Sequence, residues 1–171
     1  MNRNIALVIL GLSCLLSFWL YSNSGIQIER ALTAKEWQSK MVTLIDDELP
    51  ETPVGPLRRA DVTSNVKYLP NGTYIRVSII RLYADESESY TAINISESGD
   101  WQISDSYLLV SPLEFKDVSS SQKQDFTDEQ LILIKQLFKL DSQQSRRIDI
   151  VNEKTLLLTS LSHGSTVLFS N

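Results

Sequence analysis

The apolar and polar positions divide the chain into one continuous apolar stretch and a long remainder with alternating patterns. Ile5 to Tyr21 covers 17 positions without a charged side chain. At about 1.5 Å per helical residue, this is near the shortest helix that crosses a bilayer, roughly 17 to 25 residues. The pattern predicts a short cytoplasmic N-terminus at residues 1–4, a transmembrane anchor at residues 5–21 and one periplasmic domain at residues 22–171.

The anchor interpretation depends on the ends of the apolar stretch, which begins at Ile5. Trp19 and Tyr21 near its other end suit the headgroup layer, where an aromatic ring has an apolar body and a polar edge. A cleaved signal peptide is the alternative, with Ser22, Asn23 and Ser24 as a weak cleavage site. Arg3 on the amino side favours a cytoplasmic N-terminus by the positive-inside rule.

Two helices are predicted from their start signals. A capping box at Thr33 to Glu36 precedes apolar residues at helical spacing, which indicates a helix that ends near Glu48. A second capping box begins at Thr127 and predicts a helix that ends near Asp141. The apolar faces of the two helices are Trp37, Met41, Leu44 and Ile45 in the first, and Leu131, Ile134, Leu137, Phe138 and Leu140 in the second.

Elsewhere the apolar period drops to two, which predicts strands. Short turns connect most of them, including Asn71-Gly72 and Ser98-Gly99-Asp100, and short turns favour antiparallel neighbours. Closure hides the edges of such a meander. We therefore expect an α+β fold, mainly β with two helices, as a complete or incomplete lipocalin-like barrel; a flat sheet covered by the helices is the alternative. The seven predicted strands are 61–69, 73–82, 90–96, 101–110, 146–151, 155–161 and 165–169.

Charge and residue types exclude several classes of function. Without Arg3 the chain has 15 basic and 21 acidic residues, a net charge of −6, which disfavours direct contact with nucleic acid. Cys14 is the only cysteine and His163 the only histidine, so a triad or a zinc site lacks its residues. We expect no catalytic residues, no cofactor and no metal site; a hydrolase would need a base built from carboxylates alone.

Binding is the remaining chemistry. A barrel interior can hold one small apolar ligand. Four residues combine aromatic bodies with polar groups, as a pocket for an amphipathic acid would. These candidate ligand-binding residues are Tyr74, Arg76, Tyr90 and Trp101. Their other interpretation is as surface-facing positions of half-buried strands.

Several long segments resemble the ToxS family. They are TAKEWQSKMVTLI (33–45), DVTSNVKYLPNGTYIRVSII (61–80), WQISDSYLLVSPLEFKDVSS (101–120) and DFTDEQLILIKQLFKLDSQQSRRIDIVNE (125–153). The short start and single anchor are similar as well. The likeness covers nearly the whole chain and is looser at 83–88 and in the last dozen residues.

The resemblance implies a single-pass protein of the bacterial inner membrane that is not an enzyme. Its periplasmic domain would bind the periplasmic domain of ToxR, a membrane-spanning transcription factor, stabilise it and protect it from proteolysis. The pair would sense bile acids through a barrel to which both partners contribute, and would control virulence and porin genes. A free-standing periplasmic carrier of small amphipathic lipids is the alternative function.

Overall fold

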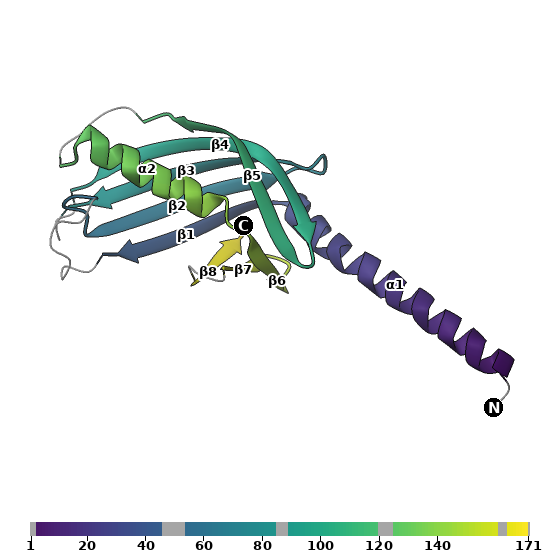
Figure 1. Cartoon of the computed structure of the whole chain (residues 1–171). Coiled ribbons are helices and arrows are strands. Elements are labelled where there is room, and N and C mark those ends of the chain that lie inside the picture. Colours follow the sequence, from purple (N-terminus) through teal and green to yellow (C-terminus); the bar gives the residue numbers. More distant parts are fainter. Residues whose placement is uncertain (1–2, 46–53, 85–88, 120–124, 161–163, 171) are drawn as a thin grey trace.

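The computed structural model of the chain describes residues 3–45, 54–84, 89–119, 125–160 and 164–170. Within these residues the chain forms two helices and eight strands (Figure 1). The helices are α1 (Arg3–Ala34) and α2 (Asp128–Ser142). The strands are β1 (Glu36–Leu44), β2 (Arg59–Tyr68), β3 (Thr73–Tyr83), β4 (Thr91–Ser104), β5 (Tyr107–Asp117), β6 (Arg146–Asn152), β7 (Thr155–Ser160) and β8 (Gly164–Phe169).

The eight strands are joined in chain order into a closed antiparallel barrel. Each strand pairs with the next, and β8 returns to β1 through the pair Gln38–Phe169. The predicted lipocalin-like barrel is confirmed, and the flat-sheet alternative is wrong.

Strands surround the barrel completely only in the half near α1, which we call the closed half. β6 to β8 have six or seven residues each, whereas β1 to β5 have nine to fourteen. β5 joins β6 only at Tyr107 and Leu108 among the described residues. Beyond these pairs β1 to β5 continue as a curved sheet, the open half, and α2 packs on its inner face (Figure 1).

The first predicted helix is wrong. α1 continues from Arg3 through Thr33 to Ala34, and Glu36–Leu44 is strand β1. Trp37 and Met41 are four residues apart, a spacing that fits one face of a helix and one face of a strand equally well. The antiparallel pairing of all nine residues of β1 with β2 decides in favour of the strand. The end of that predicted helix, at residues 46–48, lies outside the described residues.

The two turn signals had opposite outcomes. Asn71-Gly72 does connect β2 to β3, and Gly72 has a positive φ of 82°. The predicted turn at residues 98–100 is wrong, because β4 runs through it to Ser104. Gly99 instead lies at a β-bulge, where an added Cβ would be 2.2 Å from the Ser111 carbonyl oxygen. The chain reverses at residues 105–106, both with positive φ, as a two-residue hairpin requires.

The second predicted helix is confirmed as α2. The Thr127 hydroxyl accepts a hydrogen bond from the Gln130 amide, and the Gln130 side chain accepts one from the Thr127 amide. Leu131 and Ile134 are buried as expected. The prediction that Leu137 and Leu140 belong to the core is wrong, because their side chains are 51% and 61% exposed.

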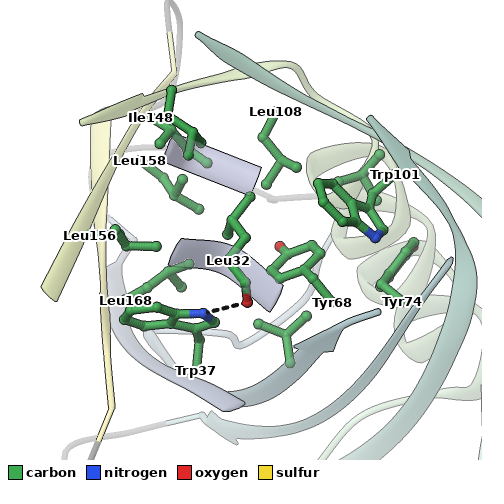
Figure 2. Packing of buried hydrophobic residues seen from close by; sticks show 13 residues of the cluster. Leu32, Trp37, Tyr68, Tyr74, Trp101, Leu108, Ile148, Leu156, Leu158 and Leu168 are labelled. Carbon is green, nitrogen blue, oxygen red and sulfur yellow. Dashed lines mark hydrogen bonds between the residues drawn. The ribbon is translucent and has the colours of Figure 1, made fainter. Parts of the chain in front are cut away.

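The closed half contains a core to which α1 and all eight strands contribute (Figure 2). The last turns of α1 enter the ring of strands, where Leu32 is fully buried. The Trp37 indole donates a hydrogen bond of 2.9 Å to the Leu32 carbonyl oxygen, so it also caps the helix. α1 therefore closes this end of the barrel. The cluster consists of Ile28, Leu32, Trp37, Val66, Tyr68, Tyr74, Trp101, Leu108, Val110, Ile148, Leu156, Leu158 and Leu168.

A second core fills the space between α2 and the inner face of β2 to β4 in the open half. Its members are Leu57, Val62, Ile80, Leu82, Ile93, Ile95, Phe126, Leu131 and Ile134. Judged over the residues that the structure describes, neither helix contains a stretch that is both long and apolar enough to traverse a bilayer.

Candidate functional site

A groove of about 600 Å³ lies in the open half, between α2 and the inner faces of β1 to β3, with the start of β8 on its other side. This volume is in the range of small-molecule sites, roughly 300 to 1,000 Å³. The lining is mainly apolar, and polar groups gather at the end of the groove where α2 leads into β6. The apolar residues include Met41, Ile45, Leu57, Val62, Ile80, Leu137, Phe138 and Leu140, and the polar end consists of Asp141, Gln144, Arg146, Ser160 and Thr166.

A smaller cavity of about 50 Å³, which we call the inner cavity, lies next to this groove. The two hollows share six lining residues, so they are direct neighbours. The shared residues are Met41, Val62, Phe138, Asp141, Arg146 and Thr166. The inner cavity is also lined by Ser64, Arg76 and Tyr68, of which Tyr68 belongs to the core of the closed half.

The inner cavity borders a layer of buried polar groups on β2, β3 and β4. Arg76 and Glu97 are register partners on β3 and β4, and Arg76 Nη1 lies 3.5 Å from Glu97 Oε1. The Tyr74 hydroxyl donates a hydrogen bond to the same oxygen. The Ser64 and Ser78 hydroxyls form a hydrogen bond of 2.7 Å beside them. A buried carboxylate is costly without such partners, so these contacts hold Glu97 in place.

Burial raises the pKa values of the two phenols in this layer. Burial raises the pKa of the Tyr68 hydroxyl, against the opposing effect of Arg76. Burial also raises the pKa of Tyr74, and its hydrogen bond to Glu97 raises it further. For Arg76 burial lowers the pKa, but Tyr68 and Glu97 outweigh it and the net pKa is raised. At neutral pH the layer presents neutral phenols and a charged guanidinium.

A second arginine, on β6, also borders the inner cavity. Arg146, the first residue of β6, donates through Nη2 to Asp141 Oδ2 at 2.6 Å and to the Asp141 carbonyl oxygen at 3.2 Å. Asp141 is in the last turn of α2, so this ion pair fixes the junction between α2 and β6. Arg146 borders both the groove and the inner cavity.

The structure brings three of the four candidate ligand-binding residues together and separates the fourth. Tyr74, Arg76 and Trp101 face the barrel interior, so the surface-facing interpretation is wrong for the fully buried Tyr74 and for Trp101, which is 7% exposed. Tyr68 lies between them, with ring centroids 6.1 Å from Tyr74 and 5.5 Å from Trp101. Arg76 alone of the four lines the inner cavity.

Tyr90 lies elsewhere, at the far end of the barrel. It is 47% exposed, and its ring packs 5.7 Å from that of Tyr83. Of the proposed anchor residues, Trp19 is on α1 and is 61% exposed. Ile5 and Tyr21 also belong to α1, but their side chains lie outside the described part of the structure. His163 lies outside the described residues as well.

Sequence reasoning missed Tyr68, Glu97 and Arg146. A signal for Glu97 was present, because it shares the inward parity of Ile93 and Ile95 and therefore had to be buried. The hairpin register pairs it with Arg76, which supplies the opposite charge. No comparable signal marked Arg146, since its position depends on how α2 crosses the barrel.

The described residues of the site form a hollow whose shape and lining are typical of binding sites. Within the described part of the chain, no group of three histidine, cysteine, aspartate or glutamate side chains is placed to hold a metal ion. What the geometry offers is an apolar groove that ends in buried polar and charged groups. Such a shape suits a ligand with an apolar body and one polar end.

Comparisons with known proteins match this chain over almost its entire length. A family model described as "Trans-membrane regulatory protein ToxS" matches residues 21–169. The chain is 66% identical over 170 residues to the transmembrane regulatory protein ToxS of Vibrio cholerae serotype O1, covering 99% of this chain and 98% of that protein. It is 63% identical over 171 residues to the protein of the same name from Vibrio parahaemolyticus serotype O3:K6, with 100% of both chains covered.

Proposed function

The chain belongs to the ToxS family of trans-membrane regulatory proteins, and from this premise we propose that it is the periplasmic partner of a ToxR-like transcription factor. ToxS is a regulatory family and not an enzyme family, and we propose that this chain likewise catalyses no reaction. It would be anchored in the inner membrane through residues 5–21, with the N-terminus in the cytoplasm and residues 22–171 in the periplasm.

The observation that carries the proposal is the open half of the barrel. Among the described residues, β1 beyond Gln38 and β5 beyond Leu108 pair with a strand on one side only. Edge strands offer unpaired backbone groups to another chain. Val42 and Leu44 on β1 are also 62% and 75% exposed. A partner domain that covers this half would bury apolar surface and complete the barrel.

Linkage gives the mechanism of protection. A chain that binds only the folded periplasmic domain of the transcription factor stabilises it by about 2.7 kcal/mol at a hundredfold excess over the dissociation constant. That gain lowers the locally unfolded fraction roughly a hundredfold, and proteases act on this fraction. A bile acid that prefers the assembled pair raises the affinity of the two chains for each other. Assembly of the pair raises the affinity for the bile acid by the same factor. Virulence and porin genes would respond through the transcription factor, without contact between this chain and DNA.

The half-life of the partner tests this function. Deleting the chain should shorten the half-life, and bile acid should lengthen it only when the chain is present. Val42→Lys places a charge on the β1 edge and should shorten the half-life, whereas Val77→Lys, on the fully paired strand β3, should not. Val77 is a matched control because it is also an exposed valine, 47% accessible. If the partner has the same half-life in the unmodified strain, the deletion strain, Val42→Lys and Val77→Lys, the proposal is contradicted.

The groove supports a second candidate function, a free-standing periplasmic carrier of small amphipathic lipids. The two functions differ in what the purified protein does alone. A carrier should stay monomeric, folded and loaded with ligand, and should elute unchanged when the periplasmic domain of the transcription factor is added. A regulatory partner should elute with that domain as a heterodimer.

A further inference from the structure

Two contacts determine how the barrel is placed on α1. Gly25 lies against Ile103 of β4, where a Cβ on Gly25 would be 3.9 Å from Ile103 Cγ2. Lys35, directly after the helix, donates a hydrogen bond of 2.8 Å to the Glu153 carbonyl oxygen in the turn between β6 and β7. Gly25 and Lys35 are ten residues apart, which is about 15 Å along a helix. α1 therefore crosses the end of the barrel from the β4–β5 hairpin, which lies beside it in Figure 1, to the β6–β7 turn.

The proposed anchor ends at Tyr21, and this gives each contact a height above the hydrocarbon core of the bilayer. Gly25 is four residues beyond Tyr21, or about 6 Å, and Lys35 is fourteen residues beyond it, or about 21 Å. The headgroup layer on one side of a bilayer is roughly 5 to 7.5 Å thick. The end of the β4–β5 hairpin therefore lies at the level of the headgroups, and the β6–β7 turn lies well outside them.

The outer face of this hairpin end faces the bilayer. Ile103 and Leu108 point into the core of the closed half, so alternation along the strands turns Gln102, Ser104 and Tyr107 outward. Gln102 and Ser104 are exposed, and Tyr107 is half-buried. Because the core extends along α1 from the hairpin toward the β6–β7 turn, the direction away from the core at the hairpin is the direction of the anchor.

The side chains of this face suit phospholipid headgroups. Tyr107 has an apolar ring and a polar phenol, the combination typical of membrane interfaces. Its register partner on β6 is Arg147, whose side chain is 59% exposed and whose guanidinium group matches the geometry of a phosphate. Two carboxylates lie beside them, Asp105 in the turn and Asp149 at 3.2 Å from Arg147 Nη2. The face thus presents both signs of charge, as the headgroup of phosphatidylethanolamine does.

We infer that the end of the β4–β5 hairpin is a second membrane contact, which binds zwitterionic phospholipid headgroups through Tyr107 and Arg147. The inference rests on the anchor of the proposed function. A single transmembrane helix tilts by about 0 to 40°, and the barrel moves with α1 because Leu32 is fully buried among the strands. The hairpin is on one side of α1, so its contact favours tilt toward that side. The open half is thereby held in one orientation relative to the bilayer.

The test is fluorescence quenching of the full chain in nanodiscs of phosphatidylethanolamine and phosphatidylcholine. Cys14→Ser removes the only cysteine, and a bimane fluorophore is attached to one new cysteine at a time. The three positions are Ser104→Cys on the hairpin, Lys154→Cys in the β6–β7 turn and Leu12→Cys in the anchor. Lipids with a nitroxide on the headgroup quench labels at the headgroup layer, and lipids with a nitroxide on the acyl chain quench labels in the hydrocarbon core. Time-resolved fluorescence gives the ratio of quenched to unquenched molecules.

A paired variant, Tyr107→Asn with Arg147→Gln, tests the two side chains. The matched control is Tyr90→Asn with Arg81→Gln, the same exchange at the far end of the barrel, where the Arg81 guanidinium lies 5.5 Å from the Tyr90 ring centroid. Loss of one phosphate contact corresponds to about a fivefold change in the ratio of docked to undocked barrels. The headgroup quenching ratio at Ser104→Cys should therefore fall at least about fivefold in the first pair and stay unchanged in the second. Near-ultraviolet circular dichroism establishes that each variant retains its packing.

The inference requires headgroup quenching of the label at Ser104→Cys and none at Lys154→Cys. Equal quenching at the two positions overturns it, and so does an unchanged ratio in Tyr107→Asn with Arg147→Gln. The label at Leu12→Cys reports on the anchor separately. If acyl-chain nitroxides quench it while the hairpin label is unquenched, the inference fails and the anchor stands. If they do not quench it, the anchor of the proposed function fails and the inference fails with it.

Discussion

Truncating Leu32 to alanine tests whether the end of α1 is an integral part of the barrel. Leu32 is fully buried in a cluster to which α1 and every strand contribute. The substitution removes three carbon groups, at about 0.8 kcal/mol each, or about 2.4 kcal/mol of transfer free energy. Because Leu32 is surrounded by strands that pair with one another, the site can collapse little, and a cavity cost adds to this. We expect a total loss of about 3 to 5 kcal/mol.

The assay is urea unfolding of the full chain in nanodiscs, followed by tryptophan fluorescence. Trp37 donates its hydrogen bond to the Leu32 carbonyl oxygen and therefore reports on this contact directly. Leu113→Ala is the control, since Leu113 is 72% exposed and the same chemical change should cost under about 0.5 kcal/mol. If Leu32→Ala costs no more than Leu113→Ala, then the end of α1 does not close the barrel.

Three further predictions follow from local structure. Thr127→Ala should cost about 1 kcal/mol in urea unfolding because it removes the cap of α2, and Thr127→Ser should restore most of it. Gly99→Ala should cost about 1 to 3 kcal/mol, since the added Cβ would lie 2.2 Å from the Ser111 carbonyl oxygen; an unchanged unfolding midpoint would refute the close approach of β4 and β5. Although burial opposes it, hydrogen bonds from Ser119 and Lys135 lower the pKa of Asp117 below its ordinary 3.8. The stabilisation from this carboxylate is therefore present above pH 3.8 and disappears as the pH falls through the lowered pKa, so acid unfolding curves of Asp117→Asn should show a weaker pH dependence in that range.

The fold could be predicted where local signals and tertiary structure agree. α2 is an example, because its capping box and its buried residues Leu131 and Ile134 indicate the same helix. β1 shows the opposite case. A capping-box pattern at Thr33 to Glu36 and the spacing of Trp37 and Met41 both fit a helix, but pairing along the whole of β2 outweighs these local preferences.

The site was only partly predictable for a related reason. Alternation along β3 places Tyr74 and Arg76 on one face, but it does not say whether that face is inside or outside. The adjacent outward residues Ile75 and Val77 are apolar and half exposed, so hydrophobicity alone indicated the wrong face. The groove could not be predicted at all, because its walls are separated in sequence and meet only once α2 crosses the sheet.

The junction between α1 and β1 has a geometric consequence for the whole molecule. Only Lys35 separates the last residue of the helix from the first residue of the strand, and Leu32 is locked within the barrel. The barrel therefore cannot rotate relative to α1. The helix fixes the direction in which the groove faces around the helix axis. Each residue inserted into α1 would turn the groove by about 100° around the helix axis and move it by about 1.5 Å. The number of residues in α1 thus determines which direction the groove faces around the axis of that helix.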